Sequence, residues 1–179
     1  ADRIGYPVVL KNASPGIIHK TETKGVALNL ANSEELRKAM SGMVAEKYLI
    51  QRMYPPALEV IIGVKYDREF GHTVLFGLGG IYVELFRDTA ISILPIDREM
   101  AGRMLEKIRW FALLRGYRGG KQLDIEALKN VLVNLSRLVS EHPAIEHIDL
   151  NPVIVLEKGL GSIILDAKME VNPIKRQSA

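Results

Sequence analysis

The chain has 179 residues, of which 47% are hydrophobic and 25% charged, as in a single globular domain that buries a sizeable core. Its 24 basic and 21 acidic residues are interspersed and leave a net charge of +3, which argues against nucleic acid as the main partner. The lack of cysteine excludes disulfides and thiolate sites and fits the cytoplasm, and no apolar run is long enough for a membrane helix.

The first part of the chain predicts three strands and one helix. Strand-like runs at 6–11 and 25–30 flank a loop rich in lysine and glycine. Asn32 and Ser33 are suited to cap a helix over 34–43. A third strand, 46–53, runs into Tyr54-Pro55-Pro56, which cannot continue a hydrogen-bonded ladder.

The rest of the chain mixes strands with helices. Apolar spacing predicts helices over 98–114 and 124–142, the second capped by Asp124, with the basic glycine-rich loop 115–122 between them. Further strands are predicted at 58–67, 72–80 and 89–96, and a hairpin at 145–169. This order indicates an α+β fold and not a regular βαβ alternation.

The C-terminal hairpin suggests a metal site. Asp149 and Asn151 are two apart in a strand and therefore share a face. A turn centred on Lys158-Gly159 would place Asn151 opposite Asp166, and such an all-oxygen set suits Mg²⁺. A turn shifted to Leu160-Gly161 would break this pairing, and a merely solvated polar face is the alternative interpretation.

The loop after the first strand suggests phosphate chemistry. Lys11 ends the strand and could contact a phosphate, although it could also simply reach water. A neutral imidazole can carry a phosphoryl group, so His19 is a candidate, with Lys20 and Lys24 to counter the phosphate charge. An ordinary solvated loop histidine is the alternative.

Two other segments have features that are unusual for plain strands. Glu59 lies within an apolar strand and must meet water or a cation. Gly79-Gly80 permits close approach of another backbone or a reacting group, or is only a tight turn. The spacing of a Walker A loop is absent, so any nucleotide site is of another kind.

Taken together, several segments resemble the ATP-grasp subunit or domain of the NDP-forming acyl-CoA synthetases, a superfamily that includes succinyl-CoA synthetase. The segments are "GYPVVLKNASPGIIHKTETKGVAL", "LIQRM", "LEVIIGVKYDREFGHTVLFGLGGIYVELFRD", "LLRGYRGGK" and "IDLNPVIV" with "ILDAKM". The resemblance covers nearly the whole chain and is greatest to β subunits of archaeal-type ADP-forming acetate–CoA ligases. It implies an ATP-grasp fold of two α+β lobes, about 1–50 and about 51–179, with the N-terminal part of the first lobe missing from this segment.

The resemblance also implies an activity and its partners. Such ligases interconvert acyl-CoA, ADP and phosphate with a free acid, ATP and CoA, through an acyl phosphate and a phosphohistidine. It implies ATP or ADP and Mg²⁺ as ligands, and a partner α subunit or domain that binds CoA. The assembly would be a hetero-oligomer of the α2β2 kind, with no nucleic acid or membrane partner.

The resemblance assigns a role to each candidate residue. It assigns catalysis to His19 and Glu84, nucleotide binding to Lys11, Gln51, Arg52, Met53, Glu59, Gly79 and Gly80, and Mg²⁺ binding to Asn151, Asp166 and Asp149. Lys24-Gly25-Val26 departs from the usual Gly-Gly-Val. The alternatives are a non-catalytic nucleotide- or CoA-sensing module fused to an acyltransferase, and a carboxylate–amine ligase, neither of which needs His19.

Overall fold

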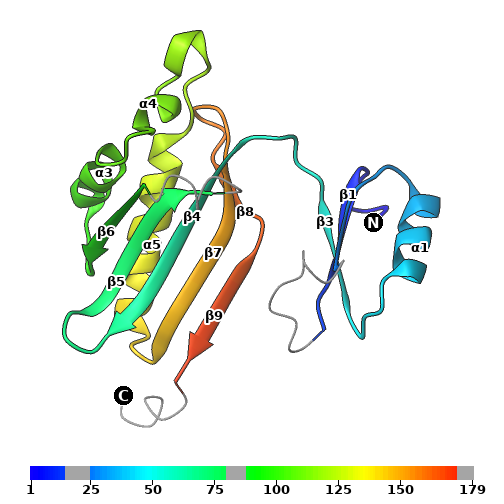
Figure 1. The fold of residues 1–179 in the computed structure, drawn as a ribbon, viewed down its shortest axis with the longest axis horizontal. Helices are drawn as coiled ribbons and strands as arrows, with labels where there is room; N and C mark the ends of the chain where they lie inside the picture. The colour runs from blue at the N-terminus through cyan, green and yellow to red at the C-terminus, as the bar shows by residue number, and fades with distance from the viewer. Residues whose placement is uncertain (15–24, 80–87, 173–179) are drawn as a thin grey trace. The chain divides into compact units, whose positions relative to one another are not determined.

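The chain folds into two compact units, Ala1–Pro56 and Ala57–Ala179 (Figure 1). The computed structural model describes residues 1–14, 25–79 and 88–172. Along the chain, the boundary between the units follows Pro55-Pro56, whose prolines cannot join a ladder. The boundary of the ATP-grasp lobes near residue 50 stays a prediction, because compactness alone defines these units.

The first unit is a three-stranded antiparallel sheet with one helix on it. Its strands β1 (Val8–Asn12), β2 (Val26–Leu30) and β3 (Tyr48–Arg52) lie in the order β2-β1-β3. Helix α1 (Ser33–Gly42) starts at Asn32, whose side chain accepts hydrogen bonds from two backbone N–H groups, as the sequence predicted. The core of this unit consists of Val8, Leu10, Leu30, Leu36 and Met43.

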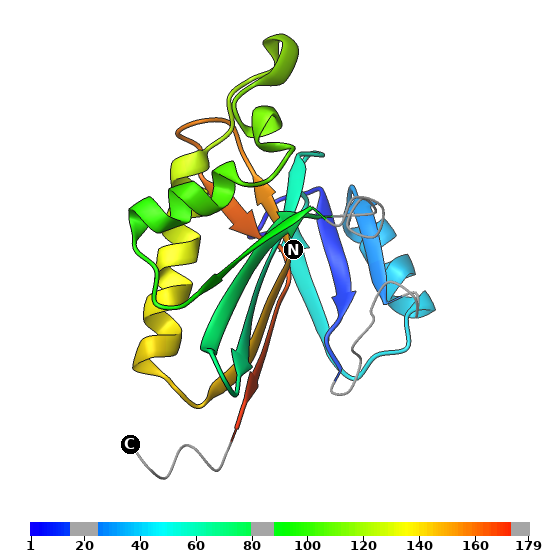
Figure 2. The ribbon, with the colours of Figure 1, turned by 60° about the vertical axis from the view of Figure 1, so that its left-hand side comes forward.

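The second unit has one larger antiparallel sheet in the order β6-β5-β4-β7-β8, with β9 also paired to β7. Its strands are β4 (Leu58–Asp67), β5 (Gly71–Leu78), β6 (Thr89–Ile93), β7 (Ile145–Val155), β8 (Ser162–Ile164) and β9 (Ala167–Val171). Helices α3 (Arg98–Glu106) and α5 (Ile125–Glu141) pack on one face of this sheet (Figures 1 and 2). These two helices do not cover the opposite face of the sheet.

Alternation along the strands explains this arrangement. On β4, the side chains of Val60, Ile62 and Val64 are fully or almost fully buried against the helices, while Glu59, which is half-buried, alternates to the other face. On α5, Leu128, Leu132 and Leu135 repeat at helical spacing and complete the core.

The predicted helix over 98–114 is wrong, because it is two helices. Helix α3 ends at Glu106, and the single turn α4 (Phe111–Leu114) follows. Between them Trp110 packs against Phe76, with ring centroids 5.5 Å apart, and the Asp88 carboxylate accepts the Arg109 N–H at 2.6 Å. These tertiary contacts break the helix at a point where the sequence contains neither proline nor glycine.

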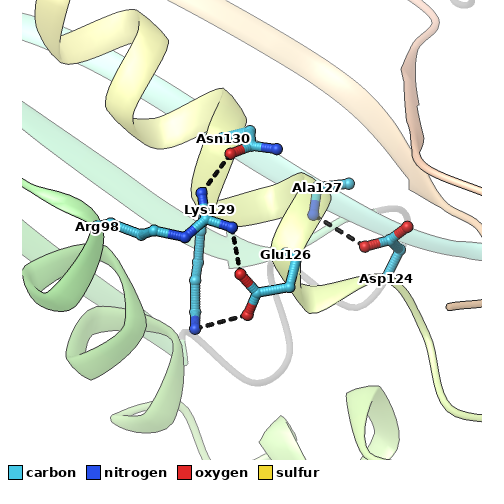
Figure 3. A network of polar contacts seen from close by, with 6 residues as sticks. All are labelled: Arg98, Asp124, Glu126, Ala127, Lys129 and Asn130. Carbon is cyan, nitrogen blue, oxygen red and sulfur yellow. Dashed lines mark hydrogen bonds and ion pairs between the residues drawn. The ribbon is translucent and has the colours of Figure 1, made fainter. Parts of the chain in front are cut away.

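Polar contacts join α3 to the start of α5 (Figure 3). Arg98 donates from α3 to Glu126 and to Asn130 on α5, and Lys129 also contacts Glu126. Exposed ion pairs of this kind stabilise a fold only slightly, so their main effect is to fix how the two helices lie against each other.

A bulge in β7 changes which face its residues occupy. Asn151 and Pro152 together lie opposite Ile61 of β4, because Val153 pairs with Val60 while Leu150 pairs with Ile62. Leu150 and Val153 therefore both enter the helix-side core, although they are three residues apart. Proline fits here, since the unpaired position of a bulge needs no N–H donor.

Within the described residues, no helix is both long enough and apolar enough to cross a membrane.

Candidate functional site

Two candidate residues of the first unit share one face of its sheet. Lys11 lies opposite Leu49, and Gln51 lies opposite Val9, so Lys11 and Gln51 occupy the face away from α1. Lys11 is only 9% exposed, which is unusual for a lysine and sets it apart from a solvated surface cation.

Arg52 and Met53, the two residues that follow Gln51, make contacts with the segment that leads into β1. The guanidinium of Arg52 donates to the carbonyl of Ile4 at 3.1 Å, and Arg52 is on the opposite face from Gln51. The N–H of Met53 donates to the Pro7 carbonyl at 3.0 Å. Of the predicted trio, Gln51 therefore lies on the same face as Lys11, while Arg52 ties down the segment that leads into β1.

In the second unit, the structure brings Glu59 and Gly79 into direct contact. The N–H of Gly79 donates to the Glu59 carbonyl at 2.7 Å. A Cβ at position 79 would lie 2.8 Å from the carbonyl carbon of Glu59. Only glycine permits this approach, so the close-approach interpretation of Gly79 is confirmed, and the partner is the backbone of β4.

The predicted register of the hairpin is also confirmed. Val153 pairs with Ile164 and Val155 with Ser162, which centres the turn on Lys158-Gly159. The Asn151 N–H donates to the Asp166 carbonyl at 3.2 Å, so these two residues are neighbours across the hairpin. Asp166 lies in the short break between β8 and β9, where the strand is irregular.

The same register gives Asp149 a partner that the sequence analysis missed. Asp149 lies directly opposite Lys168 of β9 and, on its other side, opposite Gly63 of β4. Opposite charges at facing positions stabilise an antiparallel pair by about 0.2–1 kcal/mol. The signal was available, because the turn that pairs Asn151 with Asp166 necessarily pairs Asp149 with Lys168.

The donor set fits a partly hydrated Mg²⁺ ion. Asn151 and Asp166 supply amide and carboxylate oxygens on adjacent strands, and Asp149 is next to them on β7. In the part of the chain that the structure describes, no group of three or more His, Asp or Glu side chains gathers in a way that could hold a metal. Mg²⁺ characteristically takes one or two carboxylates and completes its shell with phosphate oxygens and water.

Five predicted residues lie outside the described residues: His19, Lys20, Lys24, Gly80 and Glu84. The candidate residues that the structure does describe fall in both units. Lys11 and Gln51 are in the first unit, and Glu59, Gly79 and the hairpin residues are in the second.

The sequence matches the ATP-grasp domain family over residues 1–171. It is 42% identical over 181 residues to the β subunit of acetate–CoA ligase [ADP-forming] II of Pyrococcus furiosus, covering 94% of this chain and 77% of that protein. It is also 42% identical over 180 residues to the 4-hydroxybutyrate–CoA ligase [ADP-forming] of Nitrosopumilus maritimus, of which it covers 26%.

A solved structure is similar over nearly the whole chain. It is acetyl-coenzyme A synthetase 1 of Candidatus Korarchaeum cryptofilum in complex with coenzyme A and Mg-AMPPCP, in which a phosphohistidine segment points towards the nucleotide-binding site. The TM-score is 0.87 at 41% identity, and the match covers 96% of this chain and 79% of that one.

Proposed function

Since the chain belongs to the ATP-grasp domain family, we propose that it is the nucleotide-binding component of an ADP-forming acid–CoA ligase. It takes part in the conversion of acyl-CoA, ADP and phosphate into a free acid, ATP and CoA. The observation that carries this proposal is the similarity, over nearly all of the chain, to the β subunits of such ligases. The regulator and carboxylate–amine ligase alternatives have no comparable support, because these named relatives are acid–CoA ligases.

We assign the phosphoryl acceptor to His19. A ring nitrogen of the neutral imidazole forms a bond to the γ-phosphorus of ATP, the bond from that phosphorus to the ADP oxygen breaks, and ADP leaves. The reverse reaction returns the phosphoryl group to ADP. Lys11, buried at the end of β1, is suited to hold the nucleotide phosphates because it supplies a positive charge at a fixed place.

Mg²⁺ would be held by Asn151 and Asp166, and it would neutralise phosphate charge when bound. Asp149 lies opposite Lys168 on the neighbouring strand, and this position suits its carboxylate to orient the Lys168 ammonium. Glu59 and Gly79 define the part of the second unit from which the Gly79-Gly80…Glu84 segment starts. Glu84 is proposed as the second catalytic residue, facing the phosphohistidine loop of the CoA-binding part.

The CoA-binding part would be an α subunit or domain, in a hetero-oligomer of the α2β2 kind in the cytoplasm. Relatives of both arrangements support a partner subunit or a fused domain, because some are separate β subunits and others are long chains of which this domain is 26%.

Labelling with γ-labelled ATP and Mg²⁺ tests the acceptor. We expect acid-labile, base-stable label on the wild-type chain and none on His19→Ala. His142→Ala is the matched control, because His142 is exposed at the end of α5 and lies outside the proposed site. Label that persists in His19→Ala would refute the assignment.

A further inference from the structure

The loop between α4 and α5, residues 115–121, projects away from the sheet and helices of its unit in both views (Figures 1 and 2). It begins at Arg115 and ends at Lys121. Tyr117 near its tip is 55% exposed, and the guanidinium carbon of Arg118 lies 5.3 Å from the centre of the Tyr117 ring. This cation–π contact holds an aromatic ring and a positive charge together in water.

The backbone of this loop is folded tightly. Gly116 and Gly119 have φ of 86° and 81°, and Arg118 between them has φ of 51°, in the left-handed region that side chains other than glycine seldom adopt. A Cβ at position 116 would lie 2.4 Å from the carbonyl oxygen of Gly120, so the two ends of the loop are in backbone contact. Arginine occupies a position where glycine would be more stable, and such positions are frequently functional.

The base of the loop is fixed to the rest of the unit. The Leu123 N–H donates to the Leu114 carbonyl at 2.9 Å, and the Lys158 N–H donates to the Gln122 carbonyl at 2.8 Å. The ammonium of Lys121 contacts the Glu157 carboxylate at 2.6 Å. The tip is therefore presented in a preformed shape, which lowers the entropy lost on binding.

The charges of the tip favour an anionic partner. Lys121 is neutralised by Glu157, whereas Arg118 at the tip has no carboxylate partner among the described residues. Exposed Tyr and Arg side chains are the types most enriched at the centres of protein–protein interfaces.

The shape excludes a small anion as the main ligand. Small-molecule sites are concave, whereas Tyr117 and Arg118 stand on a projecting loop. The hollow beside the base of the loop is lined by three cations and three carboxylates, so it has no excess of positive charge to attract a free phosphate; these residues are Arg115, Lys129, Lys158, Glu106, Asp124 and Glu126.

We infer that the 115–121 loop is a docking element, in which Tyr117 and Arg118 enter an acidic recess on the CoA-binding α subunit. The identity of this partner rests on the proposed function. The loop holds the two parts of the enzyme together and takes no part in phosphoryl transfer.

The test measures binding of the CoA-binding α subunit to this chain by calorimetry at low and moderate salt. We expect Tyr117→Ala and Arg118→Ala to weaken binding about tenfold or more, as interface anchors do. Arg118→Ala should also reduce the salt dependence of binding, because it removes a charge. Phe70→Ala and Arg137→Ala are the matched controls, since both side chains are exposed in the same unit and should bind as the wild type does.

Arg118→Gly separates docking from folding. Glycine relieves the left-handed backbone, so its urea midpoint should equal or exceed that of the wild type while binding is weakened. Loop variants that bind the α subunit within twofold of the wild type would overturn the inference. So would loop variants that lose affinity for free CoA or inorganic phosphate but not for the α subunit.

Failure of this inference is distinguishable from failure of the proposed function. Labelling by γ-labelled ATP should be the same in the loop variants and the wild type. A wild-type chain that is not labelled, yet binds the α subunit through Tyr117, would refute the catalytic role and leave the docking role standing.

Discussion

Gly79 is the point at which β5 leads into the segment after it, and its contact with Glu59 leaves no room for a side chain. The carbonyl carbon and oxygen of Glu59 and the nitrogen of Val60 would all lie within 3.0 Å of an added Cβ. These are backbone atoms of a central strand, so they cannot move aside as a flexible side chain can.

Gly79→Ala should therefore destabilise the second unit by about 1–3 kcal/mol and weaken nucleotide binding, because it pushes the chain away from β4. Urea unfolding and ATP titration measure the two effects. Gly63→Ala is the matched control, since the nearest atom to its Cβ would be the Ile148 carbonyl oxygen at 3.8 Å, and it should change little. Equal effects of the two substitutions would contradict this account.

Lys168 is the second residue whose role depends on its immediate neighbour. It lies opposite Asp149 on the strand that continues from Asp166. Because Lys168 is next to the proposed Mg²⁺ ligands on the hairpin, we expect it to contact the nucleotide phosphates, and Lys168→Met should then weaken ATP binding about tenfold. Lys65→Met is the control, because Lys65 is an exposed lysine on β4 opposite His147.

A double-mutant cycle with Asp149→Asn tests the pairing itself. If Asp149 acts by orienting Lys168, the loss of ATP affinity in the double variant should be smaller than the sum of the single losses. Additive losses would show that Asp149 acts independently of Lys168, as a separate metal ligand would.

At the scale of elements, Asp124 links the start of α5 to the turn between β7 and β8. Its carboxylate accepts the N–H of Ala127 at 3.0 Å within the helix, and the N–H groups of Gly159 and Gly161 at 2.9 Å across the turn. Burial by itself raises the pKa of this carboxyl, but the backbone N–H donors together outweigh it and hold the pKa below its ordinary value. One side chain thus fixes a helix and the hairpin that contains Asn151 and Asp166.

Asp124→Asn should lower the free energy of unfolding near pH 7 by about 1–3 kcal/mol, because an amide nitrogen faces N–H donors that the carboxylate had satisfied. A lowered folded-state pKa stabilises the fold above the unfolded pKa of about 3.9, and this is lost as the pH falls through the folded-state value. The difference between wild type and variant should therefore shrink below about pH 4. Urea unfolding across this pH range measures the difference in free energy of unfolding. A difference that does not change with pH would show that the charge of the Asp124 carboxylate is not what stabilises the fold.

Sequence patterns predicted the elements well where the signal is local. The caps at Asn32 and Asp124 and the register of the hairpin follow from residue type and turn position, and all three are confirmed. The break after Glu106 and the bulge at Asn151-Pro152 were missed. Both are imposed by partners distant in sequence: Phe76 and Asp88 for the break, and β4 for the bulge.

Of the candidate site, the sequence predicted the neighbours Asn151 and Asp166 but not the contacts that orient the others. The hydrogen bond from Gly79 to Glu59 joins residues whose proximity depends on the pairing of β4 with β5. Strand alternation puts Gln51 and Arg52 on opposite faces, but which of them shares the face of Lys11 depends on the pairing of β3 with β1 and on the face that α1 covers. Neither follows from composition or spacing along the chain.

At the scale of the whole molecule, the two units have separate hydrophobic cores. Lys11 and Gln51 belong to the first unit, and Glu59, Gly79, Asn151 and Asp166 belong to the second.

Leu10→Ala should destabilise the first unit by about 2–5 kcal/mol, because Leu10 is fully buried there. Hydrogen exchange should accelerate in β1 and β3 and remain unchanged in β4 and α5. Leu132→Ala, at a fully buried position of the second core, should have the converse effect. Equal acceleration in both units after either substitution would show that they unfold as one.

The outer edge of the second sheet is divided, with β8 and β9 both lying along β7 and a break at Leu165-Asp166 between them. A long straight edge would offer a row of unpaired backbone groups on which another chain could add a strand. Here one segment is only three residues long and the next begins after an irregular step. The break that contains Asp166 also protects the protein against aggregation through this edge. A continuous strand here would lose a candidate Mg²⁺ ligand and would also expose a row of unpaired backbone groups to other chains.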